Sequence, residues 1–381
     1  MTNLNGLLRV LGKRAARVGR AIGLARGRRE KIESRRGSRE PAPRRAARLD
    51  RPSRSCDDLE SVVSAMLAQE RYALLVRPQL VGNLSETELE QARESLLRHM
   101  AIVPTGKVTL GEFDEELLAQ FADDDPANHQ AVVPVEGFFL DRYPITNGQY
   151  HEFVAGGGYA EMSIWDARVW PAVLDFVDTT GQPGPKFWID GCYAEGEEDH
   201  PVVGVSYYEA AAFARWVGKR LPTEPEWVKA ACWPVPTGPN EHLQRKFPWG
   251  DTMDRGRCNL WSGSTNGTSP VFEFAGGASV GGIHQLIGNV WEWTSGNYGS
   301  IGLAGRNLTL PTPMKSIRGG AFDTYFDVQA TCQFQSGESP VARKHNIGFR
   351  CALGLCDVDT SILHPPSMQP AESSHASEVA P

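Results

Sequence analysis

The sequence predicts one large, irregular domain of the α/β (α+β) class, with a helical extension on its N-terminal side. Three observations favour this class. Gly (39) and Pro (26) are abundant, and all ten Trp lie between Trp165 and Trp293, which indicates loops held by buried aromatic rings. Capping motifs mark separate short helices, and the stretch Gly288–Trp293 has the alternation of a strand. The hydrophobic share of 41% and the charged share of 22% are typical of globular proteins.

The first 55 residues carry a charge opposite to that of the rest of the chain. They hold 17 Lys/Arg and 4 Asp/Glu, whereas the remainder holds 22 basic and 42 acidic residues. Residues 4–25 place apolar side chains at helical spacing between basic ones, a pattern that suits the surface of an anionic membrane. A basic arm of this kind is also suited to nucleic acid, to the acidic body or to solvent. Residues 1–55 are therefore predicted to be a basic, mostly disordered arm, and 357–381 a disordered tail.

Composition also restricts the cellular setting. The chain has no apolar run long enough for a transmembrane helix, and basic residues interrupt the first 25 positions, unlike a secretory signal. A transit-like peptide stays open. The seven Cys are an odd number without CxxC spacing, so free thiols are expected rather than a disulfide framework. These features predict a cytoplasmic protein.

Helix-start motifs divide the chain. Residues 56–99 have helical periodicity, and Ser85-x-x-Glu88 is a capping box that begins the second of two predicted helices there. In the body, Ser206-x-x-Glu209 begins a helix that Gly218 ends, and Thr223-x-x-Glu226 begins another. Residues 100–111 predict a strand, a turn and a second strand. Residues 112–122 predict a short helix or an insertion, and the acidic run 123–126 a solvated loop.

One carboxylate stands between two tryptophans in the stretch Gly288–Trp293. At period 2, Trp291 and Trp293 share one face of a strand and Glu292 points to the other. A carboxylate in aromatic surroundings requires a cation, a metal ion or backbone donors. The alternative is a core strand whose Glu292 lies on the surface.

Eight motifs, taken in order, resemble the formylglycine-generating enzyme family, also called the sulfatase-modifying factor family. They span residues 100–356, and the resemblance implies an elaborated C-type-lectin-like fold for this segment. The motifs are Met100–Gly111, Gly137–Phe153, His200–Ser206, Gly218–Trp227, Phe247–Gly250, Gly288–Trp293, Arg318–Gly320 and Gly348–Cys351.

The resemblance does not extend to the copper site of the aldehyde-forming members. Ala321 occupies the position of their Ser, Thr324 the position of one copper-binding Cys, and 327–329, where the other falls, holds no Cys. The nearby Cys332, like Cys351, matches a structural disulfide half of the family. Copper is therefore not expected, because Cu(I) requires thiolate ligands.

Iron is not expected either. The sulfoxide-forming branch of the family holds iron with histidines of an HxxxHxE-type signature in a fused helical domain, and this spacing does not occur here. The segment 56–99 contains only His99. A site built from the distant His151, His284 and His345 is the remaining alternative.

Calcium transfers better by resemblance. Gln285, Gly288, Val290 and Glu292 match one family calcium site, with two backbone carbonyls and one carboxylate, so bound Ca²⁺ with a structural role is expected. A second site keeps only Asn259 and Leu260, because 263–269 holds no acidic residue. We expect the second site to be lost or occupied by water.

The substrate groove of the family also has counterparts. The resemblance assigns to it, or to its neighbourhood, Trp291, Arg318, Phe322, Tyr325, Asn346 and Arg350. The alternative is structural: packing for the aromatic residues and pairing with carboxylates for the arginines.

Two functions follow as hypotheses. The first is a family domain that no longer generates formylglycine and binds a protein or small-molecule ligand on a lectin-like scaffold. The second is an oxidoreductase of the same family with a non-standard metal site, either an aldehyde former that uses Cys332 or an iron oxygenase.

Overall fold

The computed structural model describes residues 56–111, 131–238, 242–261, 263, 266–299 and 312–363. The chain divides into the units Met1–Ser53 and Arg54–Pro381, and every described residue belongs to the second. The predicted basic arm 1–55, the segment 112–122 and the acidic run 123–126 lie outside the described residues. Within the described ranges, none of the helices combines the length and the apolar character needed to span a bilayer.

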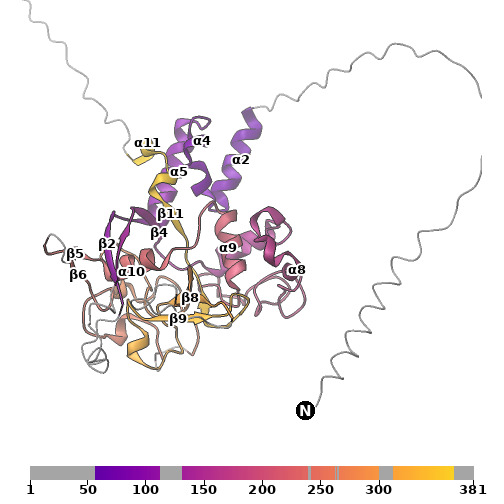
Figure 1. Cartoon of the computed structure of the whole chain (residues 1–381). Coiled ribbons are helices and arrows are strands. Elements are labelled where there is room, and N and C mark those ends of the chain that lie inside the picture. The colour runs from indigo at the N-terminus through magenta and orange to yellow at the C-terminus, as the bar shows by residue number, and fades with distance from the viewer. Residues whose placement is uncertain are drawn as a thin grey trace, which may run out of the picture. The chain divides into compact units, whose positions relative to one another are not determined.

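The helical extension consists of α2 (Cys56–Ala68), α3 (Tyr72–Leu75), α4 (Pro78–Val81) and α5 (Glu86–His99). The two predicted helices are confirmed as α2 and α5, and the short α3 and α4 lie between them. The predicted capping box is present: Glu88 N donates to Ser85 Oγ at 3.3 Å, and Ser85 N to Glu88 Oε2 at 2.7 Å. In Figure 1 these helices lie beside α11 (Thr360–Leu363) at one end of the body.

The helix α11 falls in the segment predicted to be a disordered tail. Val358 and Ile362 are buried in one cluster with residues of α3 and α5. The packed body therefore includes residues 358–363, because the buried side chains of Val358 and Ile362 pack against the helical extension. The rest of the predicted tail, 364–381, lies outside the described residues.

A three-stranded antiparallel sheet has the order β1 (Met100–Val103), β4 (Phe138–Asp141), β11 (Ala352–Gly354). The strand β2 (Gly106–Leu110) pairs instead with β3 (Ala131–Val135), and β5 (Val235–Pro236) with β6 (His242–Leu243). The two strands predicted within 100–111 are confirmed as β1 and β2. They pair with different partners rather than with each other.

A four-stranded sheet positions the candidate site. Its order is β10 (Ile347–Gly348), β7 (Trp291–Asn297), β8 (Lys315–Arg318), β9 (Gln335–Glu338), and only the β10–β7 pair is parallel. The predicted strand at 291–293 is confirmed as the start of β7. As the period-2 pattern predicts, Trp291 and Trp293 enter one hydrophobic cluster, whereas Glu292 bonds to Trp227 in another.

The body contains four further α-helices within the described ranges: α7 (Asn147–Ala155), α8 (Trp170–Val173), α9 (Tyr207–Trp216) and α10 (Glu224–Cys232). The predicted capping boxes at Ser206 and Thr223 are confirmed at the starts of α9 and α10. Short 3-10 helices lie at Met162–Ile164, Ala167–Val169, Arg255–Arg257, Ala275–Gly277, Asp327–Gln329 and Leu355–Asp357. The mixture of small sheets, short helices and long loops confirms the predicted irregular α+β class.

A buried ion pair joins the extension to the body. The Nζ of Lys219 donates to Asp141 Oδ1 at 2.7 Å and to the hydroxyl of Tyr72 at 2.8 Å. Tyr72 belongs to α3, Asp141 ends β4, and Lys219 follows α9. Because all three side chains are buried, the extension packs as part of the same core.

Candidate functional site

Two glycines and the hydrogen bonds between Ala321 and Thr324 determine the conformation of the loop that follows β8. Gly319 and Gly320 have φ values of 97° and 77°, and a Cβ on Gly319 would lie 2.6 Å from the carbonyl oxygen of Leu286. Only glycine avoids this clash. After them, Ala321 N donates to Thr324 Oγ1 at 2.8 Å and Thr324 N to Ala321 O at 2.9 Å. The Thr324 hydroxyl therefore accepts a hydrogen bond that closes this loop.

The thiols near this loop are buried and protonated. Cys332 is fully buried, and burial raises its pKa well above the usual range for a thiol. Burial likewise raises the pKa of Cys232 to about 12. The thiolate is the form that attacks and binds metals, so neither residue is poised for such chemistry at neutral pH.

This arrangement predicts slow thiol labelling in the native protein. We expect a thiol-specific reagent at pH 7.5 to modify the exposed Cys192 and Cys356 quickly, and the buried Cys232, Cys258, Cys332 and Cys351 only after denaturation. The measurement is the labelling time course followed by peptide mass spectrometry. Fast labelling of Cys332 would contradict the buried state and would favour a catalytic thiol.

The three distant histidines have separate surroundings. His151 packs against Trp188 and Tyr193, His284 stacks on Tyr143, and His345 contacts Phe187 and Phe322. Throughout the part of the chain that the structure describes, no three His, Cys, Asp or Glu side chains are placed to hold a metal ion.

The predicted calcium ligands have partners within the protein. Both oxygens of Glu292 accept from Arg350, at 2.7 and 2.8 Å, and Oε2 also accepts from the indole of Trp227. The oxygen of Gln285 accepts from Asn289, and the carbonyl of Gly288 from Val290 N. A cation at this place would have to share a carboxylate that a guanidinium already neutralises, so these contacts do not favour calcium. The site stays a prediction.

Asn289 is the centre of this region and does not stand out in the sequence. Its amide donates to the carbonyl of Ser269 and to Gln285, and its Oδ1 accepts from Ser269 N and Asn259 Nδ2. Asn259 O accepts from Asn289 N, and Leu260 O from Gly263 N, so both residues of the predicted second calcium site are engaged as well. Asn289 thus cross-links the segments that contain Asn259, Ser269 and Gln285. The backbone of Asn289 has a positive φ of 66°, and this conformation could not be recognised from the sequence alone.

These contacts predict how the protein responds to chelation. We expect excess EDTA to leave the thermal midpoint of unfolding unchanged, because the oxygens of Glu292, Gln285 and Gly288 already accept from protein donors. The measurement is one melting curve with EDTA and another with calcium at roughly 1 mM, the upper end of the Kd range of extracellular calcium-binding modules. A rise of several degrees with calcium would support the site predicted from the sequence.

Two of the predicted groove residues are buried and paired in the structure. Arg350 is fully buried on Glu292 and also donates to backbone carbonyls of Asp141 and His284. Arg318 is buried on Glu224. In this arrangement both arginines serve the packing of the four-stranded sheet, and neither presents surface to a ligand.

Other groove residues lie at the surface. Tyr325 is 62% exposed, and it lies between Phe326, 60% exposed, and Trp261, 53% exposed, with ring centroids 5.0 and 6.5 Å from its own. Trp261 and Phe326 are additions that the sequence did not suggest. We call Trp261, Tyr325 and Phe326 the aromatic patch.

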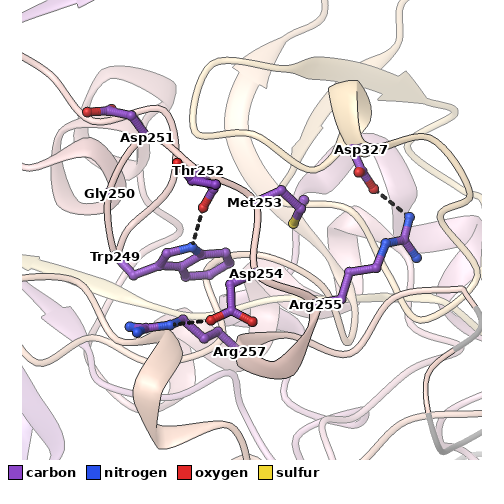
Figure 2. Close-up of a pocket in the computed structure, with 9 residues that line it drawn as sticks. All are labelled: Trp249, Gly250, Asp251, Thr252, Met253, Asp254, Arg255, Arg257 and Asp327. Atoms are coloured by element: carbon purple, nitrogen blue, oxygen red, sulfur yellow. Dashed lines mark hydrogen bonds and ion pairs between the residues drawn. The ribbon is translucent and has the colours of Figure 1, made fainter.

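An open cavity of about 770 Å³ lies beside the aromatic patch. It is lined by Trp249, Gly250, Asp251, Thr252, Met253, Asp254, Arg255, Arg257 and Asp327. Figure 2 shows Arg255 paired with Asp327 across two segments, and Arg257 with Asp254. Arg255 also donates to the carbonyl of Trp261, which ties the cavity wall to the aromatic patch. The clustering of two Asp and two Arg within residues 251–257 is the sequence signal that could have indicated this wall.

The remaining groove residues meet at the other side of the loop. The amide of Asn346 donates to both oxygens of Asp323, at 3.0 and 3.1 Å, and Phe322 lies against His345. Trp291 is mostly buried, and its ring packs on Phe334. Its backbone N–H donates to the carbonyl of Asn346. The structure therefore brings Phe322, Asn346 and Trp291 together. Arg318 and Arg350, in contrast, are buried in ion pairs.

Comparison with known proteins decides the family. Residues 85–355 match the family described as the sulfatase-modifying factor enzyme 1-like domain, which is more than half of the chain. The chain belongs to the sulfatase-modifying factor family. The fold expected from the eight motifs is thereby confirmed.

Relatives within the sulfatase-modifying factor family carry different activities in their names. Hercynine oxygenase of Mycobacterium tuberculosis is 38% identical over 172 residues, which are 43% of this chain and 39% of that protein. Inactive C-alpha-formylglycine-generating enzyme 2 of Mus musculus is 31% identical over 58% of this chain and 76% of that one. The structure of PvdO from Pseudomonas aeruginosa is 21% identical, covers 67% of this chain and 94% of its own, and has a TM-score of 0.45. The chain spans 39–54% of the three hercynine oxygenases that it matches here.

Proposed function

We propose that this sulfatase-modifying factor domain is a binding module that does not generate formylglycine. The observation that supports this most directly is the state of the loop after Gly319-Gly320. Thr324, where the family has a metal-binding thiol, is bonded to Ala321, and Cys332 is buried with a raised pKa. Neither residue is placed to supply a thiolate to copper.

The ligand would bind on the two sides of the loop that follows Gly319-Gly320. The aromatic patch and the cavity of about 770 Å³ form one side, and Asp323, His345 and Asn346 the other. Exposed aromatic residues grouped on a rigid frame are typical of interaction surfaces. A protein or small-molecule ligand is the class that this surface favours, because aromatic side chains supply contact area at a small entropy cost.

Oxygen consumption tests the proposal. The protein is purified, loaded with Cu(I) in one sample and Fe(II) in another, and mixed with a cysteine-containing peptide and with a small thiol in separate runs. We expect no consumption above that of metal and substrate alone. A matched control is the double variant Ala321→Ser with Thr324→Cys, which restores the family residues at those two positions but not the second cysteine. Turnover by the unmodified chain would overturn the proposal.

The second candidate is an iron-dependent oxidoreductase, and the identity to hercynine oxygenases favours it. That identity covers less than half of the M. tuberculosis relative. The Fe(II) sample with a small thiol addresses this candidate, and its success would replace the binding module by an oxygenase. A cytoplasmic location, and nucleic acid or an anionic membrane as partner of residues 1–55, remain proposals from the sequence.

A further inference from the structure

We infer that Asp323 and Asn346 form a subsite for a positively charged, hydrogen-bond-donating group, an ammonium or guanidinium, of the ligand. The inference rests on the proposed binding function and deepens it, because it names the chemistry that one part of the surface recognises.

The carboxylate of Asp323 is oriented by a neutral amide, that of Asn346. Asn346 donates to both oxygens of Asp323, and the side chain of Asp323 remains 30% exposed. Among the described residues, Asp323 makes no ion pair with a lysine or an arginine, and His345 Nε2 lies 3.7 Å from its Oδ2. A carboxylate has more acceptor positions than one amide group fills. Asp323 therefore retains capacity for a cation that approaches from solvent.

Asn346 supplies a second acceptor beside it. Its Oδ1 is buried and has no hydrogen-bond partner in the structure. Its Nδ2 is committed to Asp323, which determines the orientation of the amide, because an oxygen at that position would face the carboxylate oxygens. A buried acceptor without a partner destabilises the free protein, and a ligand N–H removes this cost where binding exposes the oxygen.

Aromatic rings border the carboxylate. The ring of His345 lies 5.7 Å from that of Phe322 and 6.4 Å from that of Phe187, centroid to centroid. The imidazole is 63% exposed and Phe187 is 44% exposed. Lys186 already places its own Nζ 5.7 Å from the Phe187 ring, and Lys344 is paired with Glu338. Ring faces next to an anion favour cations over neutral groups.

The backbone holds these side chains in place before a ligand arrives. Phe322 N donates to Asn289 O, and Trp291 N to Asn346 O, next to the parallel pairing of β7 with β10. The two acceptors therefore come from two anchored segments. Such preorganisation lowers the entropy cost of binding.

The test is an NMR titration of the full chain with three probes. They are an acetylated and amidated Gly-Arg-Gly peptide, the same peptide with citrulline in place of arginine, and butylguanidinium. We expect the arginine peptide or butylguanidinium to shift the side-chain amide signal of Asn346, and the citrulline peptide to bind at least about tenfold more weakly, as expected when a charge-assisted hydrogen bond becomes neutral. Equal binding of the peptide and butylguanidinium assigns the site to free cations, and binding of the peptide alone to a peptide side chain.

Asp323→Asn is the decisive variant. The substituted amide keeps the shape and an oxygen for Asn346 but loses the charge, so we expect about tenfold weaker binding with an unchanged melting curve. Asp175→Asn removes the same charge from an exposed position elsewhere and should bind as the original chain does. Equal affinity of Asp323→Asn and the original chain, equal loss in both variants, or failure of every cationic probe overturns the subsite. Because oxygen consumption is measured separately, failure here leaves the binding module standing, and turnover there removes it.

Discussion

Replacing Arg350 with methionine is expected to lower the free energy of unfolding by about 3–5 kcal/mol. The substitution leaves the carboxylate of Glu292 buried with only the indole of Trp227 as a partner, and it removes donors from carbonyls of Asp141 and His284. An unpaired buried charge is among the most destabilising changes in a core. The measurement is urea denaturation followed by tryptophan fluorescence.

Two controls separate the buried charge from a general packing effect. The double variant Glu292→Gln with Arg350→Met removes both charges and should recover part of the lost stability. Arg168→Met removes an arginine that is paired with Asp166 at the surface, and no measurable change is expected. A double variant no more stable than Arg350→Met would show that the ion pair is not the cause.

Replacing Lys219 with methionine is expected to have an effect of similar size, about 3–5 kcal/mol. Asp141 would remain buried with the backbone N–H of Cys351 at 2.8 Å as a donor but without a cation. Since Tyr72 loses its partner as well, we expect the helical extension to exchange its amide hydrogens faster than the body. Hydrogen–deuterium exchange on this variant measures the effect, and Tyr72→Phe, which keeps the Lys219–Asp141 pair, is the matched control with a loss of about 1 kcal/mol.

The same pair predicts a dependence on alkaline pH. Burial alone lowers the pKa of Lys219, but the attraction of Asp141 and Tyr72 outweighs it and raises the pKa overall. A raised folded-state pKa gives stability that is complete below the unfolded-state value, about 10.4, and that is lost as pH rises toward the folded-state value. The stability difference between the original chain and Lys219→Met should therefore shrink above roughly pH 10.4. A constant difference up to roughly pH 11.5, one unit above the usual pKa of lysine, would contradict this account.

The capping boxes are the part of the fold that the sequence predicts most completely. Ser85, Ser206 and Thr223 each bond to a residue three positions later, and all three helices begin where expected. The strand at 291–293 follows from alternation alone. These features depend on neighbours within one turn or one pleat, so a short window of sequence contains their cause.

The candidate site could not be predicted from local sequence pattern alone. Glu292 was expected to bind calcium, and the structure pairs it with Arg350, which lies 58 positions along the chain. Asp323 drew no attention in the sequence, because an acidic residue in a loop is ordinary until Asn346 and the aromatic rings surround it. The pairing of β1 with β4 rather than with β2 is of the same kind.

Short-range forces control the features that could be predicted from the amino acids alone: the family motifs, the helix starts and the alternating strand. Packing between distant segments decided the rest: which carboxylates are neutralised inside, which arginines are withdrawn from the surface, and which acceptors still face solvent. The physical reason is that the energy of a charge depends on its surroundings, and those surroundings come from residues far away in the chain.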